Sequence, residues 1–284
     1  MQTTASTTPI DVRLMGPVQV DLDLGPETIP SQKVRSLLAI LAINAGRTVP
    51  LPTILNELWG AEGLRNAKNA CHATVSRLRR TLSGAANGLI VTSGSGYRLD
   101  IAACDVDIHR YAHMLQRALH LSEQAPEEAQ ALIDRGNELW RGAALEDVDD
   151  APILNAERGR LREMHLTALE LRGACMLAIG NNFGVITAAQ PLSELHPGRE
   201  RFHQQLMTAL YLEGRQLEAL NVYRRVARAF MGEFGVQPGR NLQEIHQRIL
   251  RHEDVEPCPP VDSMARETGF GALLSAPTHA LSHV

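Results

Sequence analysis

The strongest candidates for chemistry in this sequence are the basic and hydrogen-bonding side chains of residues 66–82, NAKNACHATVSRLRRTL. Apolar side chains recur there at spacings of 4, 4, 3 and 4, the period of a helix with one buried face. This apolar stripe consists of Ala67, Cys71, Val75, Leu78 and Leu82. Residues 64–82 carry five basic side chains and no acidic one, whereas a solvated surface helix usually mixes both charges. The pattern therefore favours a helix that presents positive charge and hydrogen-bond donors to a groove of DNA.

The side chains opposite the stripe are the candidates for reading bases. They are Asn69, His72, Ala73, Ser76 and Arg77. Arg77 suits guanine because its guanidinium fork matches O6 and N7, Asn69 suits adenine, and Ala73 suits the methyl group of thymine. Arg79 and Arg80 lie toward the end of the segment and are expected to contact phosphates.

The segments before this helix predict the elements that support it. Residues 10–24 alternate apolar and polar side chains on both sides of a Gly-Pro pair, which predicts an antiparallel hairpin with one buried face. Ser31 is placed to cap a helix whose apolar spacing continues until Gly46, where glycine ends it. Residues 51–59 form a second, shorter amphipathic helix.

The segment after the basic helix predicts a second hairpin. Residues 89–91 and 97–99 are the expected strands, and the turn between them contains glycines. Hairpin, three helices and hairpin is the order of a winged helix-turn-helix preceded by an N-terminal sheet. In such proteins the second helix of the pair enters the major groove and the first supports it, so 51–59 is the expected support and 66–82 the expected reader. The turn would then place Thr92, Ser93 and Ser95 near the sugar-phosphate backbone.

The remainder of the chain predicts an all-helical module of opposite charge. Residues 1–100 hold ten basic and seven acidic residues, or +3, so that with a total of −4 the rest carries −7. This asymmetry suggests two modules with different partners. A helix begins near Asp105 and Asp107, where the dipole favours acidic residues. Further helices are expected at 126–140, 152–180, 182–195, 199–213, 215–234 and 239–251.

An internal repeat with an offset of 34 residues lies within this helical module. It aligns Leu177 with Tyr211, Ala178 with Leu212, Gly180 with Gly214, Phe183 with Leu217, Val185 with Ala219, Ile186 with Leu220 and Leu192 with Val226. This is the tetratricopeptide period, and the repeated glycine is expected where two helices pack closely. A generic helical bundle is the alternative. Residues 253–284, rich in proline and small residues, are predicted to form a disordered tail.

Several short motifs in the first part resemble one protein family. LMGPVQV, KVRSLLAILAINAGRTVP, LWG, NA, VSRLRRTL and GYRL follow one another over about residues 12–100. In order and approximate spacing they resemble the Streptomyces antibiotic regulatory protein family. The resemblance implies an OmpR-type winged helix-turn-helix at 1–102 and an all-helical bacterial transcriptional activation domain at 103–252. It also implies that such a protein activates pathway-specific biosynthetic genes.

The resemblance implies roles for two arginines, and the wing departs from the family pattern at one point. In the OmpR-type fold the arginine matching Arg77 reads bases and the one matching Arg79 contacts phosphate. Many OmpR-type wings also carry an arginine that enters the minor groove, whereas residues 93–96 of this chain are Ser-Gly-Ser-Gly. Whether this wing contacts the minor groove is therefore left open.

No pattern typical of an enzyme or of a metal site occurs in the sequence. GxxxxGK[ST], GxSxG and HExxH are absent, so we expect no catalytic residues and no cofactor. The cysteines are far apart in sequence and are expected to be reduced thiols; they are Cys71, Cys104, Cys175 and Cys258. His72 adjoins Cys71, but neighbouring helix positions cannot both face one ion, so we expect no metal.

The expected location and partners follow from these features. The N-terminus lacks the pattern of a signal peptide and no apolar run spans a bilayer, so we expect a cytoplasmic protein without membrane contact. Neither an appended ATPase module nor a receiver domain is expected. The working hypothesis is a homodimer on direct repeats in double-stranded DNA. The resemblance implies that it contacts RNA polymerase, including the sigma factor. The alternatives are a non-catalytic tetratricopeptide-like adaptor and a transcriptional repressor.

Overall fold

The computed structural model describes residues 10–22, 25–27, 29–60, 64–82, 88–233, 235–255 and 274. Contacts between Cα atoms divide the chain into two compact units, which are described separately. The first unit contains the described residues up to 114 together with 135–164 and residue 274, and the second contains 115–134 and the described residues from 165 to 255. The predicted fold class, a winged helix-turn-helix followed by an all-α tetratricopeptide-like module, is confirmed.

The first unit begins with a three-stranded antiparallel sheet. Its strands are β1 (Asp11–Arg13), β2 (Gln19–Leu22) and β3 (Gly25–Glu27), in the order β1-β2-β3. The alternating side chains of the predicted hairpin are buried: Ile10, Val12, Leu14, Val18, Val20 and Leu22. The hairpin is thus confirmed, and β3 adds a strand that the sequence did not predict, because Gly25-Pro26-Glu27 has no apolar alternation.

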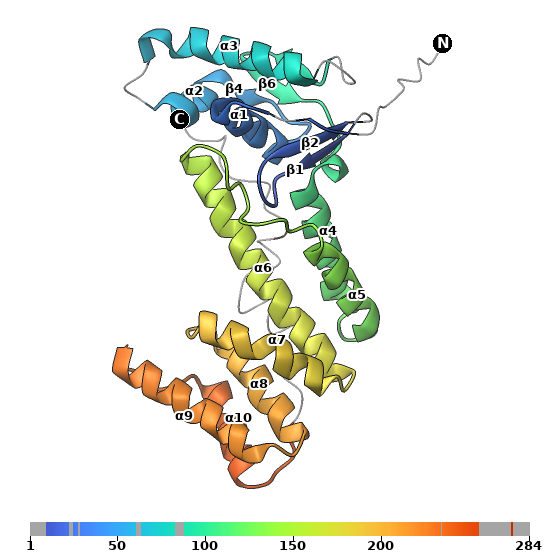
Figure 1. Ribbon diagram of the computed structural model, residues 1–284, viewed down its shortest axis with the longest axis vertical. Coiled ribbons are helices and arrows are strands. Elements are labelled where there is room, and N and C mark those ends of the chain that lie inside the picture. The colour runs from blue at the N-terminus through green and yellow to red at the C-terminus, as the bar shows by residue number, and fades with distance from the viewer. Residues whose placement is uncertain are drawn as a thin grey trace. The chain divides into compact units, whose positions relative to one another are not determined.

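Three helices follow this sheet and form the helix-turn-helix core. They are α1 (Gln32–Ile43), α2 (Leu51–Trp59) and α3 (Leu64–Leu82). Helix α3 packs against both α1 and α2 (Figure 1). Ser31 is the N-cap of α1, as predicted, although its side chain makes no capping hydrogen bond. Its backbone carbonyl instead accepts from the amides of Val34 and Arg35, each at 2.9 Å.

The wing is a second three-stranded antiparallel sheet. It contains β4 (Val49–Pro50), β5 (Ile90–Ser93) and β6 (Gly96–Leu99), in the order β4-β6-β5. The turn between β5 and β6 contains Gly94, whose φ of +55° lies in the left-handed region that glycine adopts without strain. Gly96 has a different role, because a Cβ there would lie 2.1 Å from the backbone oxygen of Val49. Only glycine allows β4 to approach β6 this closely.

The helices after the wing agree with the sequence prediction to within about three residues. A short 3₁₀ turn (Ala103–Asp105) precedes α4 (Asp107–Leu121), α5 (Pro126–Asn137) and α6 (Pro152–Ala178). The second unit continues with α7 (Asn182–Leu195), α8 (Glu200–Leu212), α9 (Gln216–Glu233) and α10 (Arg240–Leu250). Within that unit α8 packs against α7, α9 and α10 (Figure 1). No strand follows Leu99 in the part of the chain that the structure describes.

The repeat with an offset of 34 residues is visible in the backbone. Gly180 and Gly214 have φ values of +76° and +73°. Their amides donate to the carbonyls of Leu177 and Tyr211 at 3.0 and 2.9 Å, so the two helix ends are built alike. No atom lies within 4 Å of a Cβ added at either glycine. The prediction that these glycines allow close helix packing is therefore wrong, and they end the helices through their left-handed conformation.

The predicted tail falls almost entirely outside the described residues. Its first residues are packed: Val255 is 5% exposed and joins the core of the second unit, and the Tyr211 hydroxyl donates to the Glu253 carbonyl at 3.1 Å. Among the described residues, no helix is long and apolar enough to cross a membrane.

Candidate nucleic-acid interface

Helix α3 buries one face and exposes the other, as its sequence predicts. Every member of the apolar stripe is at most 2% exposed, namely Ala67, Cys71, Val75, Leu78 and Leu82. The five candidate base readers are all exposed: Asn69, His72, Ala73, Ser76 and Arg77. The amphipathic character of the helix is thus confirmed, while contact of these side chains with bases stays a prediction.

A hydrogen bond within α3 makes the Ser76 hydroxyl an acceptor toward solvent or a ligand. The Ser76 hydroxyl donates to the His72 carbonyl at 2.8 Å. Its proton is therefore directed along the helix, and its oxygen lone pairs face outward as acceptors. On the reading face Arg77 supplies donors and Ser76 supplies an acceptor, so neighbouring positions offer complementary hydrogen-bonding groups to base edges.

Arg79 ties the reading helix to the wing. Its Nε and Nη2 donate to the Ile90 carbonyl at 3.1 and 2.9 Å, and Nη2 also donates to the Thr92 hydroxyl at 3.0 Å. The guanidinium lies 5.9 Å from the centroid of the Tyr97 ring, which is 8% exposed. The sequence predicted Arg79 as a phosphate contact, and this tether, which it missed, leaves only part of the guanidinium free for that contact. Arg80 is exposed on the same helix.

The turn of the wing is fixed to the support helix. The amide of Leu51, the first residue of α2, donates to the Ser95 carbonyl at 2.9 Å. The Thr92 and Ser95 side chains are exposed and that of Ser93 is half-buried. These three predicted residues therefore lie beside two anchors, which are the bond from α2 to the Ser95 carbonyl and the Arg79 tether to the Ile90 carbonyl and the Thr92 hydroxyl. Arg98 pairs with Asp100 at 3.2 Å.

Acidic residues from a distant segment neutralise the basic residues of α1. Arg35 pairs with Asp147 at 2.9 Å and Lys33 with Asp149 at 3.1 Å. The Lys33 ammonium also donates, at 2.7 Å, to the carbonyl of Leu58, which lies in the last turn of α2. These contacts engage the charges of α1 within the first unit. Helix α3, by contrast, presents the exposed basic side chains of Lys68, Arg77, Arg79 and Arg80.

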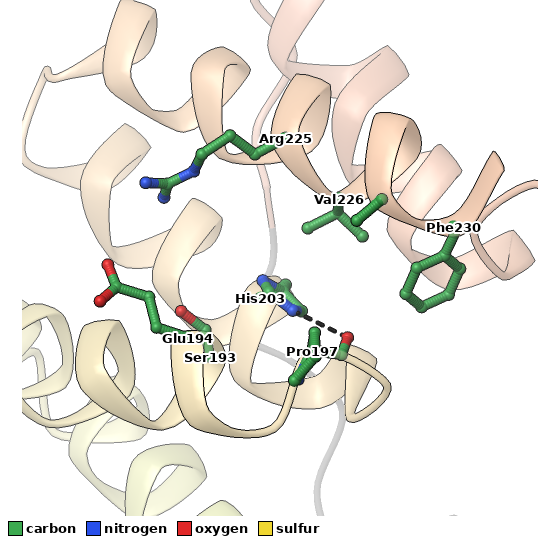
Figure 2. Close-up of a pocket in the computed structure, with 8 residues that line it drawn as sticks. Ser193, Glu194, Pro197, His203, Arg225, Val226 and Phe230 are labelled. Atoms are coloured by element: carbon green, nitrogen blue, oxygen red, sulfur yellow. Dashed lines mark hydrogen bonds between the residues drawn. The ribbon is translucent and has the colours of Figure 1, made fainter. Parts of the chain in front are cut away.

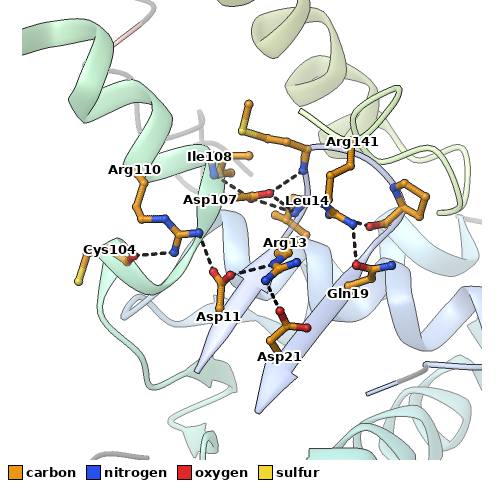
Figure 3. Close-up of polar contacts among 12 residues, drawn as sticks. Asp11, Arg13, Leu14, Gln19, Asp21, Cys104, Asp107, Ile108, Arg110 and Arg141 are labelled. Atoms are coloured by element: carbon orange, nitrogen blue, oxygen red, sulfur yellow. Dashed lines mark hydrogen bonds and ion pairs between the residues drawn. The ribbon is translucent and has the colours of Figure 1, made fainter. Parts of the chain in front are cut away.

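A buried carboxylate joins the N-terminal sheet to α4, as Figure 3 shows. Asp107 is 1% exposed and accepts from the amides of Leu14 and Met15, at 2.8 to 2.9 Å, and of Ile108 at 2.8 Å. Burial raises the pKa of this carboxyl above its usual value, and the three backbone hydrogen bonds offset this only in part. The sequence placed Asp107 at a helix N-terminus correctly but gave no sign of partners 92 and 93 residues away.

Arginines on both sides of Asp107 complete this network. Arg110 pairs with Asp11 at 2.7 Å, and Arg13 pairs with Asp11 at 2.9 Å and with Asp21. Arg141 donates to the Gln19 side chain at 2.7 Å and to the Pro17 carbonyl at 3.0 Å (Figure 3). The N-terminal sheet is thus held by residues from both α4 and the segment before α6.

The structure also separates the two side chains that suggested a metal site. Cys71 is fully buried, and burial raises its pKa to about 11, whereas His72 is exposed on the other side of α3. Among the described residues no group of three or more His, Cys, Asp or Glu side chains could hold a metal ion.

Two family models and several known proteins match this chain. The model "Bacterial transcriptional activator domain" matches residues 106–250, and "Transcriptional regulatory protein, C terminal" matches residues 26–99. RedD of Streptomyces coelicolor is 35% identical, over 89% of this chain and 77% of RedD. DnrI of Streptomyces peucetius is 28% identical, over 85% of this chain and 92% of DnrI. EmbR of Mycobacterium tuberculosis is 31% identical over 87% of this chain, which spans only 65% of EmbR.

A solved structure matches as well. Mycobacterium tuberculosis EmbR, in complex with a low-affinity phosphopeptide, superposes with a TM-score of 0.84 at 30% identity. The match covers 94% of this chain and 70% of that chain. The winged unit and the helical module therefore occur together in a known regulator, in the same order.

Proposed function

This chain belongs to the Streptomyces antibiotic regulatory protein family of transcriptional regulators, and we propose that it activates genes of a biosynthetic pathway by binding DNA upstream of their promoters. The observation that carries this proposal is the exposed face of α3, on which Asn69, His72, Ala73, Ser76 and Arg77 lie opposite a buried apolar stripe. RedD and DnrI, both named as regulators, support it as relatives.

In this proposal residues 1–102 bind DNA and residues 103–252 contact the transcription machinery. Helix α3 enters the major groove, where the fork of Arg77 reads a guanine. Arg80 and the free part of Arg79 contact phosphates, and the turn with Thr92, Ser93 and Ser95 lies along the backbone. This role for the turn is supported by the two anchors that hold it, because a fixed turn loses little conformational freedom on binding.

Binding of promoter DNA at increasing salt concentration tests the DNA claim. If each protomer neutralises about five phosphates, log K falls with log salt at a slope of about −4.5. Arg77→Ala should lower discrimination between the operator and a guanine-substituted operator by about 1–3 kcal/mol. Arg117→Ala removes the same charge from an exposed position of α4 and is the matched control. A flat salt response contradicts DNA binding, and unchanged promoter binding by Arg77→Ala favours the adaptor alternative.

We further propose that two protomers bind direct repeats side by side on one face of the duplex. Half-sites on one face are about 10–10.5 base pairs apart, or a multiple of this. Inserting about 5 base pairs between the repeats turns one site to the opposite face and should abolish cooperative binding, whereas an insertion of about 10 should restore much of it. Equal cooperativity at all spacings contradicts this arrangement.

The proposed polymerase contact is supported by apolar side chains that the second unit leaves exposed. Phe183 and Leu217 are 75% and 77% exposed, and they occupy equivalent positions in the repeat. Exposed large apolar side chains are typical of protein interaction sites. Replacing both by serine should abolish activation in a transcription assay with purified RNA polymerase and leave promoter binding unchanged. Full activation by this variant would exclude these residues as the contact, and repression by the wild type would favour the repressor alternative.

A further inference from the structure

The second unit contains a small cavity that the proposed function does not use. It has a volume of about 200 Å³ and is lined by residues of α7, α8, α9 and the segment between α7 and α8. Its lining consists of Ser193, Glu194, Pro197, His203, Arg225, Val226, Ala229 and Phe230. A single water occupies about 30 Å³ and drug-sized ligands need about 300 Å³ or more. The cavity therefore suits an organic molecule of about one ring.

A buried histidine faces this cavity with one ring nitrogen unpaired. His203 is 6% exposed, and its Nε2 lies 3.1 Å from the Pro197 carbonyl. A carbonyl only accepts, so Nε2 carries the proton. Nδ1 is buried and has no hydrogen-bond partner among the residues that the structure describes. Burial and, to a smaller extent, the charge of Arg225 lower the pKa of His203, and the hydrogen bond to the Pro197 carbonyl offsets this only in part. The ring is therefore neutral and Nδ1 is an acceptor.

The walls on the two sides of His203 differ in character. Figure 2 shows Arg225 and Glu194 on one side of the ring and Val226 and Phe230 on the other. Arg225 and Glu194 are exposed at the rim, so their side chains can move to admit a ligand. A buried acceptor without a partner destabilises the fold, and a ligand donor would remove that cost.

We propose that this cavity binds a small hydroxylated carboxylic acid, with its hydroxyl donating to His203 Nδ1 and its carboxylate accepting from Arg225. The apolar body of the ligand packs on Val226, Ala229 and Phe230. Glu194, at the same rim, repels a second carboxylate, so the site takes an acid with one carboxylate in preference to one with two.

The three hydroxybenzoate isomers are suitable probes, with benzoate as the analogue without the donor and phenol as the analogue without the acid. The full chain, labelled with ¹⁵N-histidine, is titrated at pH 7.5, and the His203 Nδ1 resonance and the dissociation constant are measured. We expect at least one isomer to bind saturably and to shift this resonance. Benzoate and phenol should bind about tenfold more weakly, since each lacks one hydrogen bond to the site.

Three variants locate the site. Arg225→Gln changes an exposed residue and should weaken the hydroxybenzoate about tenfold, because one charge-assisted hydrogen bond is lost. Ala229→Phe fills the cavity and should abolish binding, with circular dichroism checking its fold. Arg224→Gln makes the same change on the same helix, outside the lining, and should stay within about twofold of the wild type.

Three results would each overturn the proposal. They are the absence of any shift of the His203 resonance up to the solubility limit of the probes, binding that persists in Ala229→Phe, and benzoate binding as tightly as the best hydroxybenzoate. Promoter binding is measured on the same variants and is expected to be unchanged without the probe, so the cavity proposal and the DNA proposal can fail independently.

Discussion

Replacing Arg79 by lysine separates its role as a tether from a role as a phosphate contact. The substitution keeps the positive charge but removes the planar fork, which holds the Ile90 carbonyl and the Thr92 hydroxyl through three contacts of 2.9 to 3.1 Å. A lysine ammonium can replace only part of this geometry. The wing should therefore lose part of its attachment to α3, while the electrostatic attraction to DNA is kept.

The size of the effect follows from these contacts. Two lost hydrogen bonds contribute about 0.5–1.5 kcal/mol each, and the weakened cation–π contact with Tyr97 about 0.5 kcal/mol. Because Arg79 is exposed, solvent reduces the sum, and we expect the free energy of unfolding to fall by about 1–2 kcal/mol. The melting temperature should fall by about 4 °C.

Urea denaturation and salt-dependent promoter binding measure the two roles. For Arg79→Lys we expect lower stability and an unchanged salt slope. Arg77→Lys is the matched control: its stability should stay within about 0.5 kcal/mol of the wild type, while discrimination at guanine falls. If Arg79→Lys leaves the free energy of unfolding unchanged, the tether does not stabilise the wing and this reasoning is refuted.

Three further predictions concern the first unit. Asp107→Ala leaves two buried backbone amides of the N-terminal segment unpaired and should lower the free energy of unfolding by about 3 kcal/mol in urea denaturation; a loss below about 1 kcal/mol would contradict this. Gly96→Ala places a Cβ against the backbone of β4 and should cost about 1–3 kcal/mol, whereas Gly159→Ala, with no atom within 4 Å of its Cβ, should stabilise α6 slightly. Cys104 is exposed and Cys71 is buried with its pKa raised to about 11, so peptide mapping after thiol labelling of the folded protein should find Cys104 modified before Cys71; equal labelling of the two would argue against the packing of α3.

The sequence predicts the helices well because each is determined by a local period. The spacing of apolar residues in 51–59 and 66–82 gives α2 and α3 nearly to the residue, since burying one face is what stabilises such helices. The two short strands β3 and β4 were missed because they have no such local period. Each has two or three residues and contains proline, so no alternation can be seen and the pairing depends on distant partners.

The site was predicted in part. Features set by local sequence were predicted, and contacts between residues distant in sequence were not. Which side chains of α3 face outward depends only on the helix period, so their exposure could be predicted. The Arg79 tether and the Asp107 network depend on carbonyls and amides of residues 11 to 93 positions away. Backbone groups carry no residue-specific signal in a sequence. The unpaired nitrogen of His203 could not be predicted either, because it results from packing of three helices.

The ion pairs of α1 change the meaning of the charge asymmetry along the sequence. The net charges of +3 and −7 suggested that each part of the chain meets a different partner, but Asp147 and Asp149 of the acidic part are paired with Arg35 and Lys33 of the basic part. The net charge summed along the sequence therefore includes four charges that neutralise one another inside the first unit and are not available to a partner. Helix α3 differs because residues 64–82 contain no acidic residue and Lys68, Arg77, Arg79 and Arg80 are exposed. Positive charge gathered on one exposed helix face, rather than the net charge of a region, is thus the property that supports DNA binding.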